Sequence, residues 1–146
     1  MKKNHGFTLA ELLIATTVLL LASVGILFTY VQCLDLNSIN HDSSSVMQQT
    51  RNMMEEILAS SSATVHDTYN EKTFPIERPT GIILVKVNDQ DPQLLIVTVK
   101  SFWKQAKGRV IGEDLNLNGS LEENEDTNKN GELDSPYTLV SYIYHR

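Results

Sequence analysis

The residues whose types and spacing suggest chemistry lie in two consecutive copies of the pattern D-x-N-x-N-G. The copies begin at Asp114 and Asp126, twelve residues apart. Alternating positions 1, 3 and 5 direct three oxygen-bearing side chains at one centre, and the Gly at position 6 permits a sharp turn. Calcium takes about six to eight oxygen ligands. The sequence therefore predicts calcium as a cofactor, bound by two tandem loops.

The two loops differ in how complete they are. Loop 1, residues 114–125, has Glu122 at position 9 and Glu125 at position 12, where a bidentate Glu is expected. Loop 2 begins at Asp126 and has Asp134 at position 9, but Tyr137 stands at position 12. We expect loop 2 to borrow Glu123 or Glu125, or to bind weakly. The predicted ligands are Asp114, Asn116, Asn118, Ser120, Glu122, Glu125, Asp126, Asn128, Asn130, Glu132 and Asp134.

Apolar residues at position 8, Leu121 and Leu133, are expected to hold each loop against the core. The flanks Arg109–Gly112 and Pro136–Tyr142 look extended, so the segment resembles the tandem calcium loops of dockerins and thrombospondin type-3 repeats more than an EF-hand. The window Glu113–Asp134 holds eight acids and one Lys, a net charge of −7. Such a segment repels itself without a cation. The alternative is a solvated acidic loop with Asn-Gly turns.

The other end of the sequence has the composition of a membrane helix. Leu12–Val31 is twenty residues without a charged side chain, about 30 Å of helix and about the thickness of a bilayer core. Lys2 and Lys3 precede the run and no Lys or Arg follows until Arg51. The positive-inside rule then places residues 1–6 in the cytoplasm and the chain from about residue 34 outside.

The residues around the start of this run form a motif. The stretch Gly6–Ala15 reads Gly-Phe-Thr-Leu-Ala-Glu-Leu-Leu-Ile-Ala after a short basic leader. It resembles the processing site of type IV prepilins and type II secretion pseudopilins. The resemblance implies cleavage between Gly6 and Phe7 by a prepilin peptidase, which also methylates the Phe7 amine. It further implies other pilin or pseudopilin subunits and an inner-membrane assembly platform as partners.

Glu11 is a carboxylate residue immediately before the apolar run. An ionised carboxylate within a membrane helix is costly unless it is paired. By resemblance the mature helices bundle in a filament, where Glu11 would face the N-terminal ammonium group of a neighbouring subunit and set its axial register. The alternative is a Glu that extends to water at the membrane surface.

The remainder predicts an α+β domain of the pilin type, with a long helix packed on a small antiparallel sheet. The stripe Val46, Met47, Met54, Ile57 and Leu58 is expected to face the core, with a weak point at His41–Ser45 and an end at Ser60–Ser62. Ala59–Thr80 reads as a connecting loop. Strands are expected at Ile82–Val87, Leu94–Val99 extending to Trp103, and Tyr137–Tyr144, with the first two joined as a hairpin.

These expectations divide the chain into three parts. Residues 1–6 are a leader, 7–33 a transmembrane and filament-core helix, and 34–146 a periplasmic pilin-like domain with a calcium loop insert at 113–135. The protein is then a single-pass inner-membrane subunit, later drawn into a periplasmic pseudopilus or an extracellular pilus.

A net charge of −6 argues against general nucleic-acid binding. The single Cys33 excludes an internal disulfide.

The expected function is that of a structural subunit of a type II secretion pseudopilus, not of an enzyme. The four His residues are scattered and no nucleophile, phosphate-loop or dinucleotide motif occurs. The alternatives are a minor type IV pilin in adhesion, twitching motility or DNA uptake, a membrane-anchored calcium-binding module that never polymerises, and an anchored hydrolase.

Overall fold

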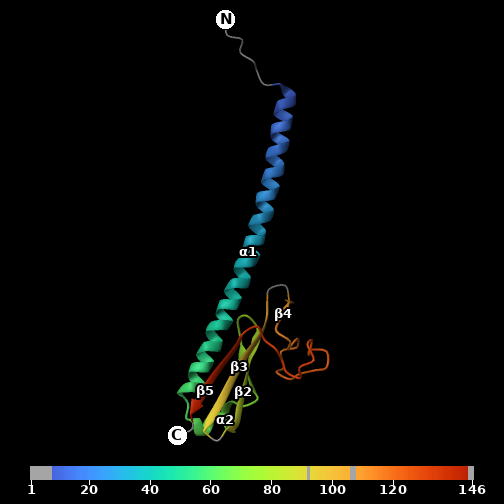
Figure 1. Cartoon of the computed structure of the whole chain (residues 1–146). Coiled ribbons are helices and arrows are strands. Elements are labelled where there is room, and N and C mark those ends of the chain that lie inside the picture. Colours follow the sequence, from blue (N-terminus) through green and yellow to red (C-terminus); the bar gives the residue numbers. More distant parts are fainter. Residues whose placement is uncertain (1–7, 92, 106–107, 145–146) are drawn as a thin grey trace. The chain divides into compact units, whose positions relative to one another are not determined.

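A computed structural model describes residues 8–91, 93–105 and 108–144 of the chain. The chain divides into two compact units, Met1–Ser38 and Ile39–Arg146. Helix α1, Leu9–Ala59, contributes to both of them (Figure 1). The other elements are α2 Ser62–Tyr69, β1 Lys72–Ile76, β2 Gly81–Asp91, β3 Leu94–Lys104, β4 Val110–Ile111 and β5 Thr138–Tyr144. The predicted class, a long helix with a small antiparallel sheet, is confirmed.

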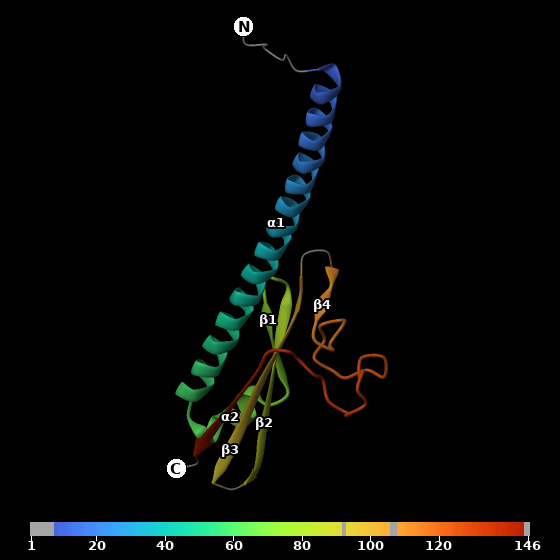
Figure 2. The same ribbon diagram turned by 45° about the horizontal axis from the view of Figure 1, so that its top comes forward.

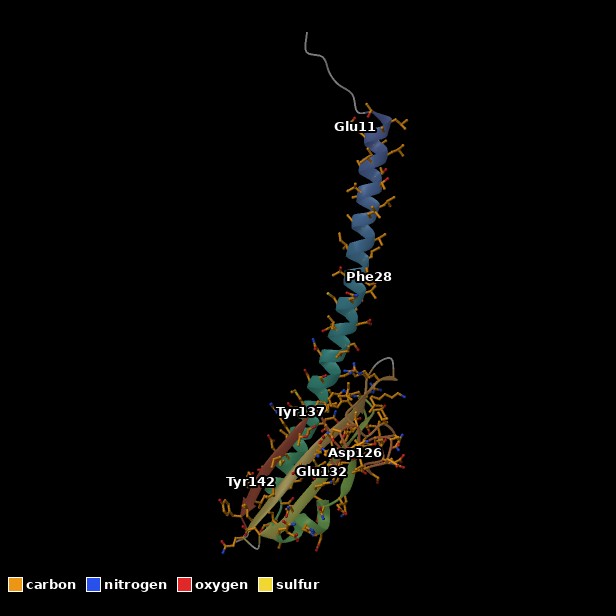
Figure 3. All side chains as sticks on the ribbon, turned by 45° about the vertical axis from the view of Figure 1, so that its right-hand side comes forward. Glu11, Phe28, Asp126, Glu132, Tyr137 and Tyr142 are labelled. Carbon is orange, nitrogen blue, oxygen red and sulfur yellow. The ribbon has the colours of Figure 1, made fainter. Side chains whose placement is uncertain are left out.

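The first unit is the apolar part of α1. Its large side chains, Phe28 among them, stand out from the helix and are mostly exposed (Figure 3). The hydroxyl groups of Thr17 and Ser23 donate to the carbonyl oxygens of Leu13 and Leu19, four residues earlier, so these polar groups are satisfied within the helix. Among the described residues, α1 alone is long and apolar enough to cross a membrane.

The second unit begins with the remainder of α1, which runs unbroken through His41–Ser45. The predicted weak point is therefore wrong. The buried stripe is Val46, Thr50, Met54 and Ile57. Met47 and Leu58 stay 41% and 44% exposed, so their assignment to the core is wrong as well. Spacings of four, four and three residues keep one line along a helix, and the two exposed side chains lie one position off that line.

The sheet is antiparallel throughout, with β3 at its centre. Strands β2 and β3 pair with Val85 opposite Val99, and β5 pairs with β3 with Ser141 opposite Val97. The three predicted strands, the hairpin and the extension through Trp103 are confirmed. The order is β1-β2-β3-β4, with β5 also on β3.

The interval Ala59–Thr80 is not the connecting loop that the sequence suggested, because it contains α2 and β1. Only Val65 and Tyr69 of α2 are buried, which is too short an apolar pattern to reveal a helix. Pro75 argued against a strand, but β1 lies at the edge of the sheet. An edge strand tolerates a missing N–H because one of its sides forms no ladder.

The two faces of the sheet bury different partners. One face packs on α1 and α2 in the main core, through side chains such as Val85, Val97 and Val99. Leu84 and Phe102 point to the opposite face and pack with Leu133. The segment between β4 and β5 therefore covers part of the face that α1 leaves free, as the ribbons also show (Figures 1 and 2).

Candidate functional site

Glu11 belongs to a capping box at the start of α1. The Thr8 backbone N–H and its hydroxyl donate to Oε2 of Glu11 at 2.8 and 2.9 Å. The Glu11 N–H donates back to the Thr8 hydroxyl at 3.3 Å. This reciprocal arrangement satisfies backbone donors that a helix start would otherwise leave free. Gly6 and Phe7, the predicted processing residues, lie outside the described residues.

The two predicted calcium loops share one set of hydrogen bonds. In loop 1 the carboxylate of Asp114 accepts the N–H groups of Asn118 and Gly119 at 3.1 and 2.7 Å. In loop 2 the carboxylate of Asp126 accepts the equivalent N–H groups, at 3.0 and 2.9 Å. The Gly at position 6 has φ of +77° in loop 1 and +78° in loop 2. The repeated sequence therefore folds as a repeated structure.

The side chains at positions 3, 5 and 9 converge in both loops. In loop 1 the amide groups of Asn116 and Asn118 donate to one oxygen of Glu122 at 2.8 and 3.0 Å. In loop 2 the amides of Asn128 and Asn130 donate to one oxygen of Asp134 at 2.6 and 2.8 Å. The backbone N–H of Ser120 and of Glu132, at position 7, donates to the position-5 amide oxygen. The structure thus brings the predicted residues of each loop together.

Loop 1 is closed by Glu125, which is 2% exposed. Its Oε1 accepts the N–H of Leu115 at 2.9 Å, and its Oε2 accepts the N–H of Glu122 at 3.3 Å. The Glu125 N–H donates to the Glu122 carbonyl oxygen at 3.0 Å. The predicted position-12 residue therefore lies at loop 1, where its carboxylate is held by backbone donors.

Loop 2 is closed by Glu113, a residue outside the D-x-N-x-N-G pattern and not among the predicted ligands. Its Oε1 accepts the N–H of Thr127 at 3.3 Å, and its Oε2 accepts the N–H of Asp134 at 3.0 Å. The Glu113 N–H donates to the Asp134 carbonyl oxygen at 2.9 Å. The structure thus gives Glu113 the place in loop 2 that Glu125 has in loop 1. Glu123, one of the two residues that loop 2 was expected to borrow as a ligand, is exposed.

A signal for Glu113 was present in the sequence. Both copies read E-D-x-N-x-N-G when the preceding residue is included, so Glu113 and Glu125 are equivalent in the repeat. A calcium-loop pattern begins with the Asp at position 1, which leaves Glu113 outside it. The role of Glu113 depends on a contact with a residue 21 positions later, which no local pattern specifies.

Both loops contact the sheet, but through different positions of the repeat. Leu133 is 3% exposed and packs on Phe102 and Leu84, as predicted. Leu121, the same position of loop 1, is 38% exposed, so that prediction is wrong. The half-buried Leu117 packs against this cluster instead. The two copies present the same position in different directions, so position 8 meets the sheet only once.

A buried cation connects loop 2 to the sheet. The Lys100 side chain of β3 is 10% exposed and its ammonium group lies 3.1 Å from a carboxylate oxygen of Glu132. It lies 3.8 Å from Oδ1 of Asp134 and donates to the Leu133 carbonyl oxygen at 2.8 Å. Asp134 therefore faces the Asn amides of the loop with one oxygen and the sheet with the other.

The donor set of each loop is rich in amide oxygens. Among the described residues no group of three His, Cys, Asp or Glu side chains is arranged to hold a metal ion. Two of the predicted ligands in each loop are Asn, and position 7 would contribute a backbone carbonyl. The oxygen chemistry suits a hard cation such as calcium, and calcium binding stays a prediction.

Comparison with known proteins identifies a motif in the N-terminal segment. Residues 1–27 match a family model described as the prokaryotic N-terminal methylation motif. The searches of curated proteins and of solved structures gave no match. The chain carries a type IV pilin-like prepilin signal, which implies processing by a prepilin peptidase and assembly with other pilin subunits. Proteins with this motif are structural, and the motif with the apolar helix indicates membrane anchoring.

Proposed function

We propose that this chain is a structural subunit of a type II secretion pseudopilus. It is cut between Gly6 and Phe7, methylated on the Phe7 amine and assembled through α1, with its globular unit in the periplasm. The single observation that carries this proposal is a methylation motif at residues 1–27, on a long helix that is followed in the chain by a small antiparallel sheet.

In this proposal Glu11 acts in assembly as well as in capping. The mature helix would begin with a cationic amine at Phe7, four residues before Glu11. A carboxylate among packed apolar helices is costly alone and much less so beside an ammonium group. Glu11 of an arriving subunit would therefore favour the register that places it beside a neighbour's amine.

Calcium is the proposed cofactor of the two loops. Two observations support calcium binding. The side chains at positions 3, 5 and 9 converge in each loop, and the window Glu113–Asp134 has a net charge of −7. In each loop the position-9 carboxylate accepts hydrogen bonds from Asn amide groups. A bound cation could replace these donors as the positive partner of the carboxylate. Bound calcium would supply the positive charge that this segment lacks, and it would be available outside the cytoplasm. The acidic segment would then finish folding only after the chain has been exported from the cytoplasm.

The cysteine content bears on the choice between a secretion pseudopilus and a pilus. The chain has a single Cys and so lacks the Cys pair with which many pilins staple a C-terminal loop. This difference favours a pseudopilin over a minor type IV pilin.

A clean deletion in the source bacterium tests the proposal, scored for secreted proteins and for surface pili in the same strain. Loss of secretion with pili intact is the expected result, and complementation by the wild-type gene is the control. Loss of pili, twitching or DNA uptake with secretion intact would establish the minor pilin instead.

Two further readings are tested by other measurements. A surface module that never polymerises would give no crosslinks between Cys residues substituted along α1, whereas a filament subunit gives ladders of linked copies. An anchored hydrolase would require an activity of the purified protein.

A further inference from the structure

Glu113 and Glu125 occupy equivalent positions, because each stands immediately before the Asp that begins a loop and each carboxylate binds loop backbone. Glu113 stands immediately before Asp114, the first residue of loop 1, yet its carboxylate binds the backbone of loop 2. Glu125 stands immediately before Asp126, the first residue of loop 2, and its carboxylate binds the backbone of loop 1. Glu125 therefore closes its own loop, whereas Glu113 closes loop 2 from the residue that precedes loop 1.

These contacts bring together two short segments, 113–115 and 125–127, which we call the junction. The Leu115 N–H donates to Oε1 of Glu125 at 2.9 Å, and the Thr127 N–H donates to Oε1 of Glu113 at 3.3 Å. Each donor lies two residues after one of the two Glu residues. The junction is thus a reciprocal pair of hydrogen bonds between equivalent positions of the repeat.

The junction also buries charge. Asp114 is 0% exposed and Glu125 is 2% exposed. A buried carboxylate is tolerated only while its hydrogen-bond donors stay in place. If loop 1 opens, these carboxylates must return to water, and Glu113, which stands next to Asp114 and closes loop 2, is displaced with them.

We propose that the two loops order and open as one unit, residues 113–134, because each depends on the junction. Separate loops would each keep their own hydrogen bonds when the other is disturbed. Loop 2 contacts the sheet through Leu133 and Lys100. Loop 1 contacts the sheet separately, through Leu117 and where Gly119 lies beside Thr73 of β1, so the junction is the contact that would couple its order to that of loop 2.

The test is amide hydrogen exchange in the full-length chain in detergent micelles. The reporters are the N–H groups of Gly119 in loop 1 and Gly131 in loop 2, which donate to Asp114 and Asp126. Glu113→Gln keeps the shape of the side chain but leaves only one oxygen to accept, so it weakens bonds made to loop 2 alone.

The expected result is exchange at least about tenfold faster at both Gly119 and Gly131 in Glu113→Gln. Faster exchange at Gly131 alone would show two independent loops and overturn the proposal. Exchange in the wild-type chain too fast to measure in both loops, with and without calcium, would also overturn it, because no ordered unit would exist.

Two variants complete the design. Glu125→Gln weakens bonds made to loop 1 and should accelerate exchange at Gly131 too. Glu123→Gln makes the same charge change at an exposed side chain for which no hydrogen bond or ion pair is described, and it should leave both reporters unchanged. Fluorescence of Trp103, buried in the main core, checks that the domain remains folded in each variant.

The same samples separate this proposal from calcium binding. If calcium binds, which rests on the proposed function, both reporters should slow at the same calcium concentration, with a Hill coefficient above 1. If calcium has no effect and the variants still accelerate both reporters, the loops are coupled and the calcium proposal fails. If calcium slows the reporters at clearly different concentrations, calcium binding stands and the coupling fails.

Discussion

Lys100 on β3 donates a hydrogen bond of 2.8 Å to the carbonyl oxygen of Leu133 in loop 2. The Leu133 side chain packs on the same sheet face, against Phe102. One polar and one apolar contact therefore fix the same point of an acidic loop. The same ammonium group lies 3.1 Å from Glu132. Its removal would leave a buried carbonyl without its donor and a carboxylate without its cation.

Lys100→Met should lower the free energy of unfolding by about 2–3 kcal/mol, measured by urea unfolding with Trp103 fluorescence. Lys86→Met is the matched control, since Lys86 is exposed on the neighbouring strand β2. It should change stability by no more than about 0.5 kcal/mol. Equal effects of the two substitutions would show that the buried cation has no special role.

Gly119 and Gly131 are equivalent positions that differ in surroundings. Both have positive φ, and a Cβ at either would cost about 1–2 kcal/mol. A Cβ at Gly119 would also collide with the Thr73 methyl group of β1, whereas one at Gly131 would meet nothing. Gly119→Ala should therefore destabilise the protein more than Gly131→Ala, in thermal unfolding of the two variants.

The variant Thr73→Ser removes the methyl group that Gly119→Ala would meet, so it should restore part of the loss in the double variant. It should give no such recovery with Gly131→Ala. If Gly119→Ala and Gly131→Ala are equally destabilising, loop 1 does not pack on β1 as described.

The capping role of Glu11 can be separated from its proposed charge role. Glu11→Gln can keep the hydrogen bonds to Thr8 but loses the charge, because Gln also serves in a capping box. Thr8→Ala loses the cap and keeps the charge. We expect Glu11→Gln to be processed normally and to enter filaments at least about tenfold less than wild type, given the cost of an unpaired ammonium.

Filament incorporation is measured by immunoblot of sheared fractions against total protein. Thr8→Ala should assemble better than Glu11→Gln. The opposite order would make Glu11 a capping residue and remove its role in register.

Calcium should stabilise the globular unit. With a dissociation constant of about 10⁻⁴–10⁻³ M, about 1 mM calcium adds about 0.4–1.4 kcal/mol for each site. For a unit of this size that raises the melting temperature by about 2–6 °C for each site. The measurement is thermal unfolding of the full chain in detergent, with magnesium at the same concentration for comparison.

Glu122→Gln should reduce the calcium response, because Glu122 lies among the converging side chains of loop 1. Glu123→Gln should keep it. An unchanged melting temperature at several millimolar calcium would contradict calcium binding.

The sequence predicted those parts of the fold that depend on local pattern. The apolar run, the strands of the β2–β3 hairpin and β5 each have a periodicity or composition that their environment requires. The element α2 was missed because just two of its side chains, Val65 and Tyr69, are buried. The core position Thr50 was missed because a polar residue in a core needs a partner, here the Ser101 hydroxyl on a distant strand.

The candidate site shows the same division. The repeat identified the residues that converge in each loop, since their contacts span a few positions. Glu113 and Lys100 were not identified, because their partners lie 14 to 33 positions away. The direction of Leu121 depends on how the loops face the sheet, which the pattern does not encode.

The mass of the N-terminal peptide tests prepilin processing most directly, in protein isolated from the membrane of its source bacterium. We expect a mature chain that begins at Phe7 and carries one added methyl group on its amine. A strain without the prepilin peptidase should retain the uncut chain. A chain that keeps residues 1–6 in the wild-type strain, or that is cut beyond the apolar run, would show that this protein is not processed as a prepilin.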